Sequence, residues 1–214
     1  MLRNLATIMI RPRATMRRIL DDAGSRAWLG MLLLASISAG FGDFDRTGFD
    51  NIVRAAKAYG IPAVVVILAM ILAIVVSMSI LFYVFSWAAW GIGKALEGTG
   101  SPGEVRRAFA WGLAPIVWAL LYRVPVAIFW EGAVKAQVSG TGSRFTFDPG
   151  KLGDGCLMTL IVGVLELIAF VWCIAVSSNT VGEAHRFSSW RGLATIVLTS
   201  IAPLILVVAA VLAM

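Results

Sequence analysis

Long apolar runs dominate the sequence, and the short polar segments between them carry nearly all of the charged residues. An α-helix of about 20 apolar residues spans the roughly 30 Å hydrocarbon core of a bilayer. The pattern therefore predicts an all-α, polytopic membrane protein with five transmembrane helices, at residues 28–42, 61–93, 108–130, 156–178 and 193–214.

The first two predicted spans depart from the ideal length in opposite directions. Residues 28–42 are few, so this helix must borrow length from the residues before it or thin the bilayer locally. Residues 61–93 carry no charge and are too many for one upright span, which predicts a tilted helix with Trp87 and Trp90 at the interface. A secretory signal peptide is a competing interpretation of Leu2–Gly42, but its basic part is unusually long, and we expect the first span to be retained.

Composition agrees with the membrane class. Apolar residues make up 59% and charged residues 14% of the chain, and the mean hydropathy is +0.88. Soluble domains typically have about 45–50% apolar and about 25% charged residues. The apolar content excludes a disordered chain, and the count of two cysteines excludes a disulfide-stapled secreted module. A single histidine leaves no zinc-binding constellation, and we expect no metal, no cofactor and no enzyme activity.

The distribution of Lys and Arg predicts the orientation, since basic loops stay on the cytoplasmic side. If the N-terminus is cytoplasmic, the predicted outer loops contain equal numbers of basic and acidic residues, and the whole net charge of +6 falls on the inner side. We therefore predict a cytoplasmic N-terminus and an external C-terminus. A basic surface placed against a membrane points to anionic lipid headgroups rather than to nucleic acid.

Residues 1–27 are predicted to form a separate, basic and amphipathic segment on the cytoplasmic side, followed by the five-span domain at residues 28–214. Apolar residues occupy one helical face before Pro12 and another face after it, and arginines fill the remainder. An interfacial helix of this kind lies in the headgroup layer, where its apolar face enters the lipid and its basic residues contact anionic headgroups. Docking of a cytoplasmic partner protein is the alternative interpretation.

The polar loop after the second span predicts a helix start. Ser101 is a typical N-cap, Pro102 suits the first helical position, and Glu104 is placed to complete a capping box. The glycines around this loop do not make a nucleotide site, because the Gly-Lys-Ser/Thr ending of a phosphate-binding loop is missing. Nearer the C-terminus, we expect His185, beside Glu183, to be a solvated loop histidine.

Two ionisable residues fall inside predicted spans, Arg123 in the third and Glu166 in the fourth. A charge inside the hydrocarbon costs at least about 2.5–3.5 kcal/mol, so such residues are rare. Counted from the outer ends of their helices, the two lie at similar depth, and we expect them to approach each other or to share a polar cavity. One interpretation is structural, either a salt bridge that sets the register of the two helices or an arginine that snorkels outward. The other is an ion, proton or headgroup site. Pro115 and Pro125 predict kinks in the third span.

Three stretches together resemble the bacterial branch of the Yip family, the Ypt/Rab-interacting membrane proteins. Arg11–Leu20 is similar to the proline-threonine-arginine motif near that family's N-terminus. Gly91–Gly98, Gly100–Glu104 and Pro115 resemble its glycine turn, short cytoplasmic helix and third-span proline. Val181–Arg191 resembles the loop before its final span. The resemblance implies five spans, a cytoplasmic N-terminus and an external C-terminus, and it implies no catalytic residue.

These observations predict a non-enzymatic scaffold or adaptor of the bacterial inner membrane, which contacts anionic lipid, partner membrane proteins or further copies of itself through its cytoplasmic face. The residues predicted to contact headgroups are basic and lie in the predicted cytoplasmic segments: Arg13, Arg17, Arg18, Arg106, Arg107 and Arg191. The alternative is a channel or transporter for ions or small solutes that uses Arg123 and Glu166. A water-accessible cavity reaching Glu166 would favour the transporter, and a dry, packed pair would favour the scaffold.

Overall fold

The computed structural model describes residues 2–22, 26–42, 46–129 and 152–212, and every regular element in these ranges is a helix. The first five helices are α1 (Leu2–Ile10), α2 (Pro12–Asp21), α3 (Ala27–Gly42), α4 (Arg46–Ala58) and α5 (Ala63–Ala95). The remaining helices are α6 (Pro102–Gly112), α7 (Ala114–Trp118), α8 (Leu120–Phe129), α9 (Leu152–Ala184) and α10 (Ser189–Leu212). The predicted all-α class is confirmed for the described residues.

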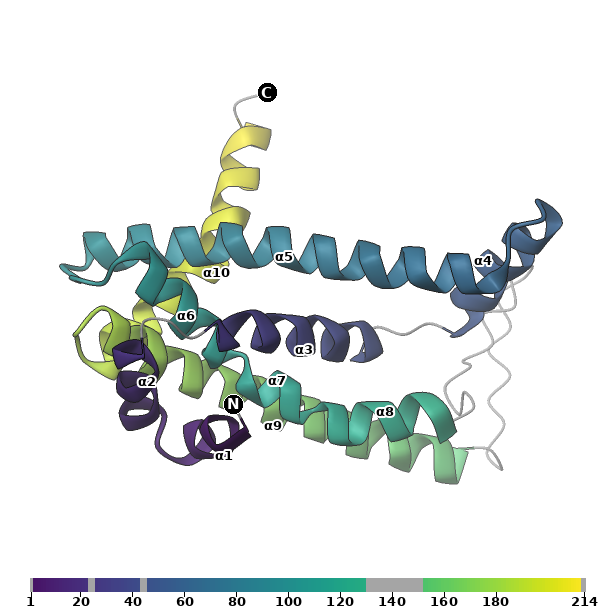
Figure 1. Ribbon diagram of the computed structural model, residues 1–214, viewed down its shortest axis with the longest axis horizontal. Coiled ribbons are helices and arrows are strands. Elements are labelled where there is room, and N and C mark those ends of the chain that lie inside the picture. Colours follow the sequence, from purple (N-terminus) through teal and green to yellow (C-terminus); the bar gives the residue numbers. More distant parts are fainter. Residues whose placement is uncertain (1, 23–25, 43–45, 130–151, 213–214) are drawn as a thin grey trace.

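The helices form an elongated bundle (Figure 1). The long helices α5 and α9 run along the molecule, and α3 lies between α5 and the α7–α8 pair. The short helices α1 and α2 cover one end, where α2 packs against α9 and α6. α10 contacts both α9 and α5 but crosses them instead of running alongside, so its C-terminal part leaves the bundle.

Among the described residues, two helices are long and apolar enough to cross a membrane, α5 and the stretch Leu160–Ala184 of α9. The segments Pro102–Trp118 and Leu120–Val126 make a third if this bent pair is counted as one span. The apolar stretch of α3, Ala27–Gly40, is shorter than a span. The described residues thus support a membrane protein with two or three candidate spans, and the five-span arrangement stays a prediction.

α5 is one uninterrupted helix, as its charge-free sequence predicts. Pro62 stands at its N-cap, where the missing N–H removes no hydrogen bond from the helix. Val64, Leu68 and Leu72 are 60%, 61% and 64% exposed, whereas Phe82 is buried in the core near the other end of the helix. An apolar helix surface left open over this length is typical of contact with lipid.

The third predicted span, residues 108–130, is not one helix. The chain breaks at Leu113, because Pro115 has no N–H to donate to the carbonyl of Trp111 and its ring clashes with that carbonyl. A bend of 44° then separates the α6–α7 segment from α8. Pro125 lies inside α8. The predicted kinks therefore take the form of a helix broken at Leu113, beside Pro115, and bent again at Ala119, between the two prolines.

The apolar faces of α1 and α2 pack into the protein. Leu5 and Ile8 of α1 are buried in the same core as Met16 and Ile19 of α2, together with side chains of α3, α6 and α9. The expectation that these side chains enter the lipid is therefore wrong, because the helices packed around them already remove their apolar surface from water. The basic side of α2 remains exposed.

α9 ends at Ala184, further along the chain than Ser178, where the fourth predicted span stops. Polar residues do not interrupt the helix here, because their side chains bond back to its carbonyls. Asn179 Nδ2 donates to Ala175 O at 2.8 Å, for example. Parts of three predicted segments, residues 1 and 23–25 of the N-terminal segment, residue 130 of the third span and residues 213–214 of the fifth, lie outside the described residues.

Candidate functional site

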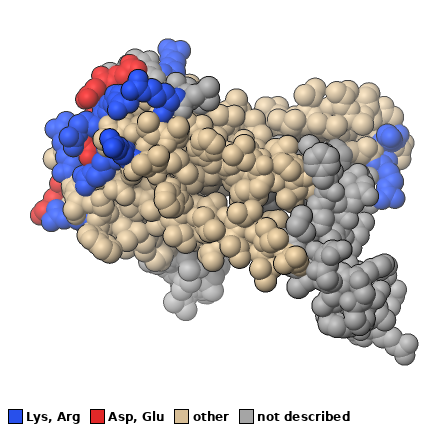
Figure 2. Space-filling view, turned by 90° about the horizontal axis from the view of Figure 1, so that it is seen from below, with Lys and Arg blue, Asp and Glu red and all other residues tan. Residues whose placement is uncertain are grey.

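Charged side chains gather at the end of the molecule formed by α2, the turn between α5 and α6, and the turn between α9 and α10 (Figure 2). The three stretches singled out in the sequence meet here. Arg13 of α2 contacts Glu183 of α9, and Thr99 N in the α5–α6 turn donates to His185 O at 3.1 Å. We call this region the charged end and take it as the candidate functional site.

Tight turns close both α5 and α9 at the charged end. At the end of α9, Phe187 N donates to Gly182 O at 3.0 Å, which is the long hydrogen bond of a Schellman motif, and α5 ends in the same way. The left-handed residues of these turns are Arg186 (φ 58°) and Glu97 (φ 68°). Glycine is the usual residue at that position, and Gly60 occupies it after α4. The left-handed conformation of Arg186 and of Glu97 therefore costs about 1–2 kcal/mol at each residue, relative to a right-handed conformation.

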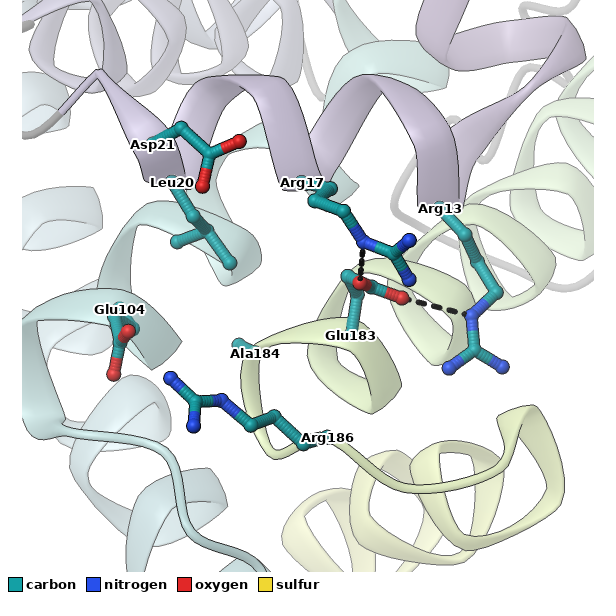
Figure 3. Close-up of a pocket in the computed structure, with 8 residues that line it drawn as sticks. All are labelled: Arg13, Arg17, Leu20, Asp21, Glu104, Glu183, Ala184 and Arg186. Atoms are coloured by element: carbon teal, nitrogen blue, oxygen red, sulfur yellow. Dashed lines mark hydrogen bonds and ion pairs between the residues drawn. The ribbon is translucent and has the colours of Figure 1, made fainter.

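Arg13 and Arg17 lie one turn apart on α2 and point toward the last turn of α9 (Figure 3). Arg13 Nε donates to Glu183 Oε2 at 3.0 Å, and Arg17 Nε donates to Glu183 Oε1 at 2.7 Å. Arg13 Nη2 also donates to Phe187 O at 2.9 Å, and its Nη1 donates to Ser189 Oγ at 3.3 Å. The Glu183 side chain is 9% exposed, so these bonds compensate the burial of its charge. They hold α2 against the α9–α10 turn.

A pocket of about 410 Å³ lies between α2, the start of α6 and the end of α9 (Figure 3). Ligand pockets commonly have volumes of about 300–1,000 Å³. The Arg186 side chain reaches across from the α9–α10 turn toward Glu104. Positive and negative charges balance in the lining, which contains Arg13, Arg17, Arg186, Asp21, Glu104 and Glu183.

Glu104 has two roles at the rim of this pocket. Its Oε2 accepts from Ser101 N at 2.7 Å, and its own N–H donates to Ser101 Oγ, so the predicted capping box at the start of α6 is confirmed. Burial alone would raise the pKa of Glu104, but the bonds with Ser101 and the nearby Arg186 and Arg107 hold this pKa below its ordinary value. Glu104 is therefore a carboxylate at neutral pH.

His185 is not the solvated loop histidine that we expect from the sequence, because only 1% of it is exposed. Its ring stacks on Phe187 with the centroids 5.1 Å apart. On other sides it meets Gly93 and Gly98, where an added Cβ would collide with the ring. The Schellman turn causes the difference, since it folds the chain back under the α5–α6 turn. Burial lowers the pKa of His185, so the imidazole is neutral at pH 7.

The other predicted headgroup residues surround the charged end without lining the pocket. Arg18 is exposed on α2. The Arg106 guanidinium lies 4.8 Å from the centroid of the Tyr83 ring, a cation–π contact. Arg107 Nη1 donates to Asp22 O, at the end of α2, at 3.5 Å. Arg191 Nη1 donates to Glu97 Oε2, at the end of α5, at 3.4 Å. Arg18, Arg107 and Arg191 thus carry charge at the surface of this end.

Away from the charged end, the structure brings Arg123 of α8 and Glu166 of α9 together. Arg123 Nε donates to Glu166 Oε1 at 2.8 Å and its Nη2 donates to Oε2 at 2.5 Å, which makes a bidentate pair. Arg123 Nη1 also donates to Ser38 O at 2.9 Å, and Ser38 Oγ donates to Ile116 O at 2.5 Å. The network therefore joins α3, α7, α8 and α9.

The acidic half of the pocket is what the sequence does not reveal. From sequence alone, Glu104 is only a capping residue and Glu183 a loop residue, because no local pattern shows that α6 and α9 meet α2. The spacing of Arg13 and Arg17, four residues apart on one helical face, is a usable signal, since it places two guanidinium groups within reach of one shared acidic partner.

A family model described as the Yip1 domain matches residues 6–212 of the chain. The match covers nearly the whole chain, so the protein belongs to the Yip1 family, in agreement with the resemblance of its three stretches. No curated protein and no solved structure matches the chain.

Proposed function

We propose that this member of the Yip1 family is a non-enzymatic scaffold or adaptor of the bacterial inner membrane. Five helices span the bilayer in this proposal, with the N-terminus cytoplasmic and the C-terminus external. The charged end faces the cytoplasm and contacts anionic lipid headgroups. Partner membrane proteins, or further copies of the chain, bind the same face.

The division of the molecular surface is the observation that carries the proposal. Large apolar side chains are exposed along α5 and α9, for example Leu72 at 64% and Phe170 at 63%, whereas charged residues gather at the charged end (Figure 2). Trp87 and Trp190 are 54% and 78% exposed in segments that lead into this end, where tryptophan is typical of a membrane interface. Each basic residue near an anionic leaflet contributes about 1 kcal/mol to membrane attraction.

The contacts of Arg123 support a scaffold rather than a transporter. Its Nε, Nη1 and Nη2 all donate to partners on two other helices, and the bidentate geometry with Glu166 fixes the register of α8 against α9. An arginine whose nitrogens all donate to other helices in this way stabilises the packing of those helices. Within the five-span arrangement this pair lies inside the membrane, where breaking it is costly.

A channel or transporter for ions or small solutes is the second candidate function. The observation that favours it is the Glu166 side chain, which is 36% exposed and therefore not sealed by the protein alone. If Glu166 carries transport, Glu166→Gln abolishes flux in vesicles while the protein still folds. If the pair is structural, the same variant lowers stability and no flux is found in either protein.

Purification in a mild detergent followed by native mass spectrometry tests the scaffold proposal. We expect the chain to carry anionic phospholipid together with a second copy or another membrane protein. A triple variant, Arg18→Gln/Arg107→Gln/Arg191→Gln, should lose most of the anionic lipid. Lys57→Gln, which removes one charge from α4 at the opposite end, is the control and should lose none. Lipid bound without preference for anionic headgroups, or equal loss in both variants, would contradict the proposal.

A further inference from the structure

We propose that the pocket between α2, α6 and α9 binds a headgroup in which a phosphate is linked to a primary ammonium, as in phosphatidylethanolamine. This inference rests on the proposed function for the position of the charged end in the headgroup layer. It adds a defined binding site and a zwitterionic ligand to the general attraction of surface arginines for anionic lipid.

The balance of charges in the pocket favours a zwitterion. Three guanidinium groups and three carboxylates line it, so its formal charge is zero. A purely anionic ligand would meet the repulsion of Asp21 and Glu104, and a purely cationic one would meet Arg186. A ligand that carries one charge of each sign, a few bonds apart, satisfies both sets of residues.

The pocket also holds unused hydrogen-bonding groups of both kinds. In the ranges that the structure describes, neither Nη nitrogen of Arg17 nor any side-chain nitrogen of Arg186 has a hydrogen-bond partner, and guanidinium nitrogens of this kind suit phosphate oxygens. On the acidic side, Glu104 Oε1 and the Asp21 carboxylate accept no hydrogen bond from the same residues. A primary ammonium has three N–H donors for these oxygens, whereas a trimethylated ammonium has none.

The backbone of Arg186 is an independent observation. Its φ of 58° is the conformation that glycine adopts most easily, and Gly60 fills the equivalent position after α4. Glu97 has the same backbone conformation at the end of α5, but of the two residues Arg186 is the one that lines the pocket. Backbone strain of this kind commonly marks a functional position. The strained turn directs the Arg186 guanidinium across the pocket toward Glu104 (Figure 3). The cation proposed to bind the phosphate and the carboxylate proposed to bind the ammonium therefore face each other.

The surroundings of the pocket indicate a lipid as the source of this headgroup. Ile10, which precedes α2, is 81% exposed, and Trp190, which follows the Ser189 contact of Arg13, is 78% exposed. Neither side chain lines the pocket, but each is close in the chain to a residue that lines it or contacts its lining. Exposed apolar residues at a charged end suit a site at the membrane interface, where they enter the upper acyl region. A soluble phosphorylated amine offers the same headgroup chemistry, and the experiment separates the two sources.

The test measures binding of phosphatidylethanolamine and phosphatidylcholine to the full-length protein in detergent micelles by native mass spectrometry. Because charge-assisted hydrogen bonds to the ammonium are available only to the first lipid, we expect it to bind about tenfold more tightly. Glu104→Gln should bring the two affinities close together, and it spares the fold because glutamine also completes a capping box. Arg186→Gly should weaken both lipids, and glycine suits that backbone position.

Arg18→Gln is the matched control, since Arg18 is exposed on α2 and does not line the pocket. It should leave the preference for phosphatidylethanolamine unchanged while it lowers binding of phosphatidylglycerol, which reports on the proposed function separately. Equal affinities of the two zwitterionic lipids for the wild-type protein, or a preference that survives Glu104→Gln, would overturn the inference. Soluble O-phosphoethanolamine that binds as tightly as the lipid would support the same pocket with a soluble ligand, and much weaker binding would support the lipid.

Discussion

Replacing Glu183 by glutamine removes the shared partner of Arg13 and Arg17 and should loosen α2 from the end of α9. Glutamine keeps the volume of the side chain, so the change isolates the charge. Because Glu183 is 9% exposed and accepts from both arginines, its substitution affects two charge-assisted bonds at once, at 3.0 and 2.7 Å.

The magnitude follows from the exposure of the three side chains. A hydrogen bond to a charged group contributes about 1.5–3 kcal/mol when it is well buried, whereas an exposed ion pair contributes about 0.2–1 kcal/mol. Arg17 is 71% exposed and Arg13 is 39% exposed, so each bond lies in the lower part of this range. We expect Glu183→Gln to cost about 1–3 kcal/mol. Arg17→Gln should cost less, because the Arg17 guanidinium is exposed to solvent. Arg13→Gln should lie between them, because Arg13 also donates to Phe187 O and Ser189 Oγ.

Hydrogen exchange of the α2 amides, followed by mass spectrometry on the full-length protein in lipid nanodiscs, measures this local stability. A loss of about 1.4 kcal/mol accelerates exchange tenfold if α2 opens as a unit. We therefore expect the α2 peptide of Glu183→Gln to exchange about 5 to 150 times faster, with exchange in α5 unchanged. Arg18→Gln, on the same helix, is the control. Unchanged exchange in Glu183→Gln, or equal acceleration in Arg18→Gln, would refute the reasoning.

Three further predictions concern stability and are measured by thermal unfolding of the full-length protein. Arg123→Gln or Glu166→Gln alone should destabilise by about 3–5 kcal/mol, and the double variant by less, because each single change leaves an uncompensated charge; a double variant as unstable as the sum would contradict the pairing. Glycine in place of Arg186 or Glu97 should stabilise by about 1 kcal/mol by relieving the positive φ, and a loss would be the contrary result. Burial in the folded state lowers the pKa of His185 below 6.5, so the stabilising contribution of the neutral imidazole should be complete above about pH 6.5 and decline as the pH falls below it. A variant with His185 replaced by a non-ionisable residue should lack this dependence on pH.

Features with a local cause could be predicted from the sequence. The charge-free run at residues 61–93 contains no proline after its first turn, and its two glycines lie in the last three residues. One long helix follows, and α5 is that helix. The capping box of Ser101 and Glu104 depends only on residues three apart, and it forms as expected. The family resemblance belongs with these features, because its motifs are short and contiguous.

Features that depend on distant contacts could not be predicted. The apolar face of α1 and α2 has the pattern of a lipid-facing helix, yet Ile8 and Met16 are buried against other helices, and amphipathicity alone does not distinguish the two surroundings. His185 is buried by a Schellman turn with arginine at the left-handed position, where the sequence has no glycine to indicate the turn. Glu183 is buried in the last turn of α9 because α2 packs against it. The pocket follows from these two features, so its acidic residues are visible only in three dimensions.

The measurement that tests the central claim most directly is the lipid selectivity of the protein in bilayers, given by electron paramagnetic resonance of spin-labelled phosphatidylglycerol and phosphatidylcholine. If the charged end meets anionic headgroups, the association constant of phosphatidylglycerol exceeds that of phosphatidylcholine severalfold and declines with salt, since several basic residues act together. The Arg18→Gln/Arg107→Gln/Arg191→Gln variant should show a smaller ratio, and Lys57→Gln should keep the wild-type ratio. Equal association of the two lipids with the wild-type protein, or a preference that the triple variant retains in full, would contradict the claim.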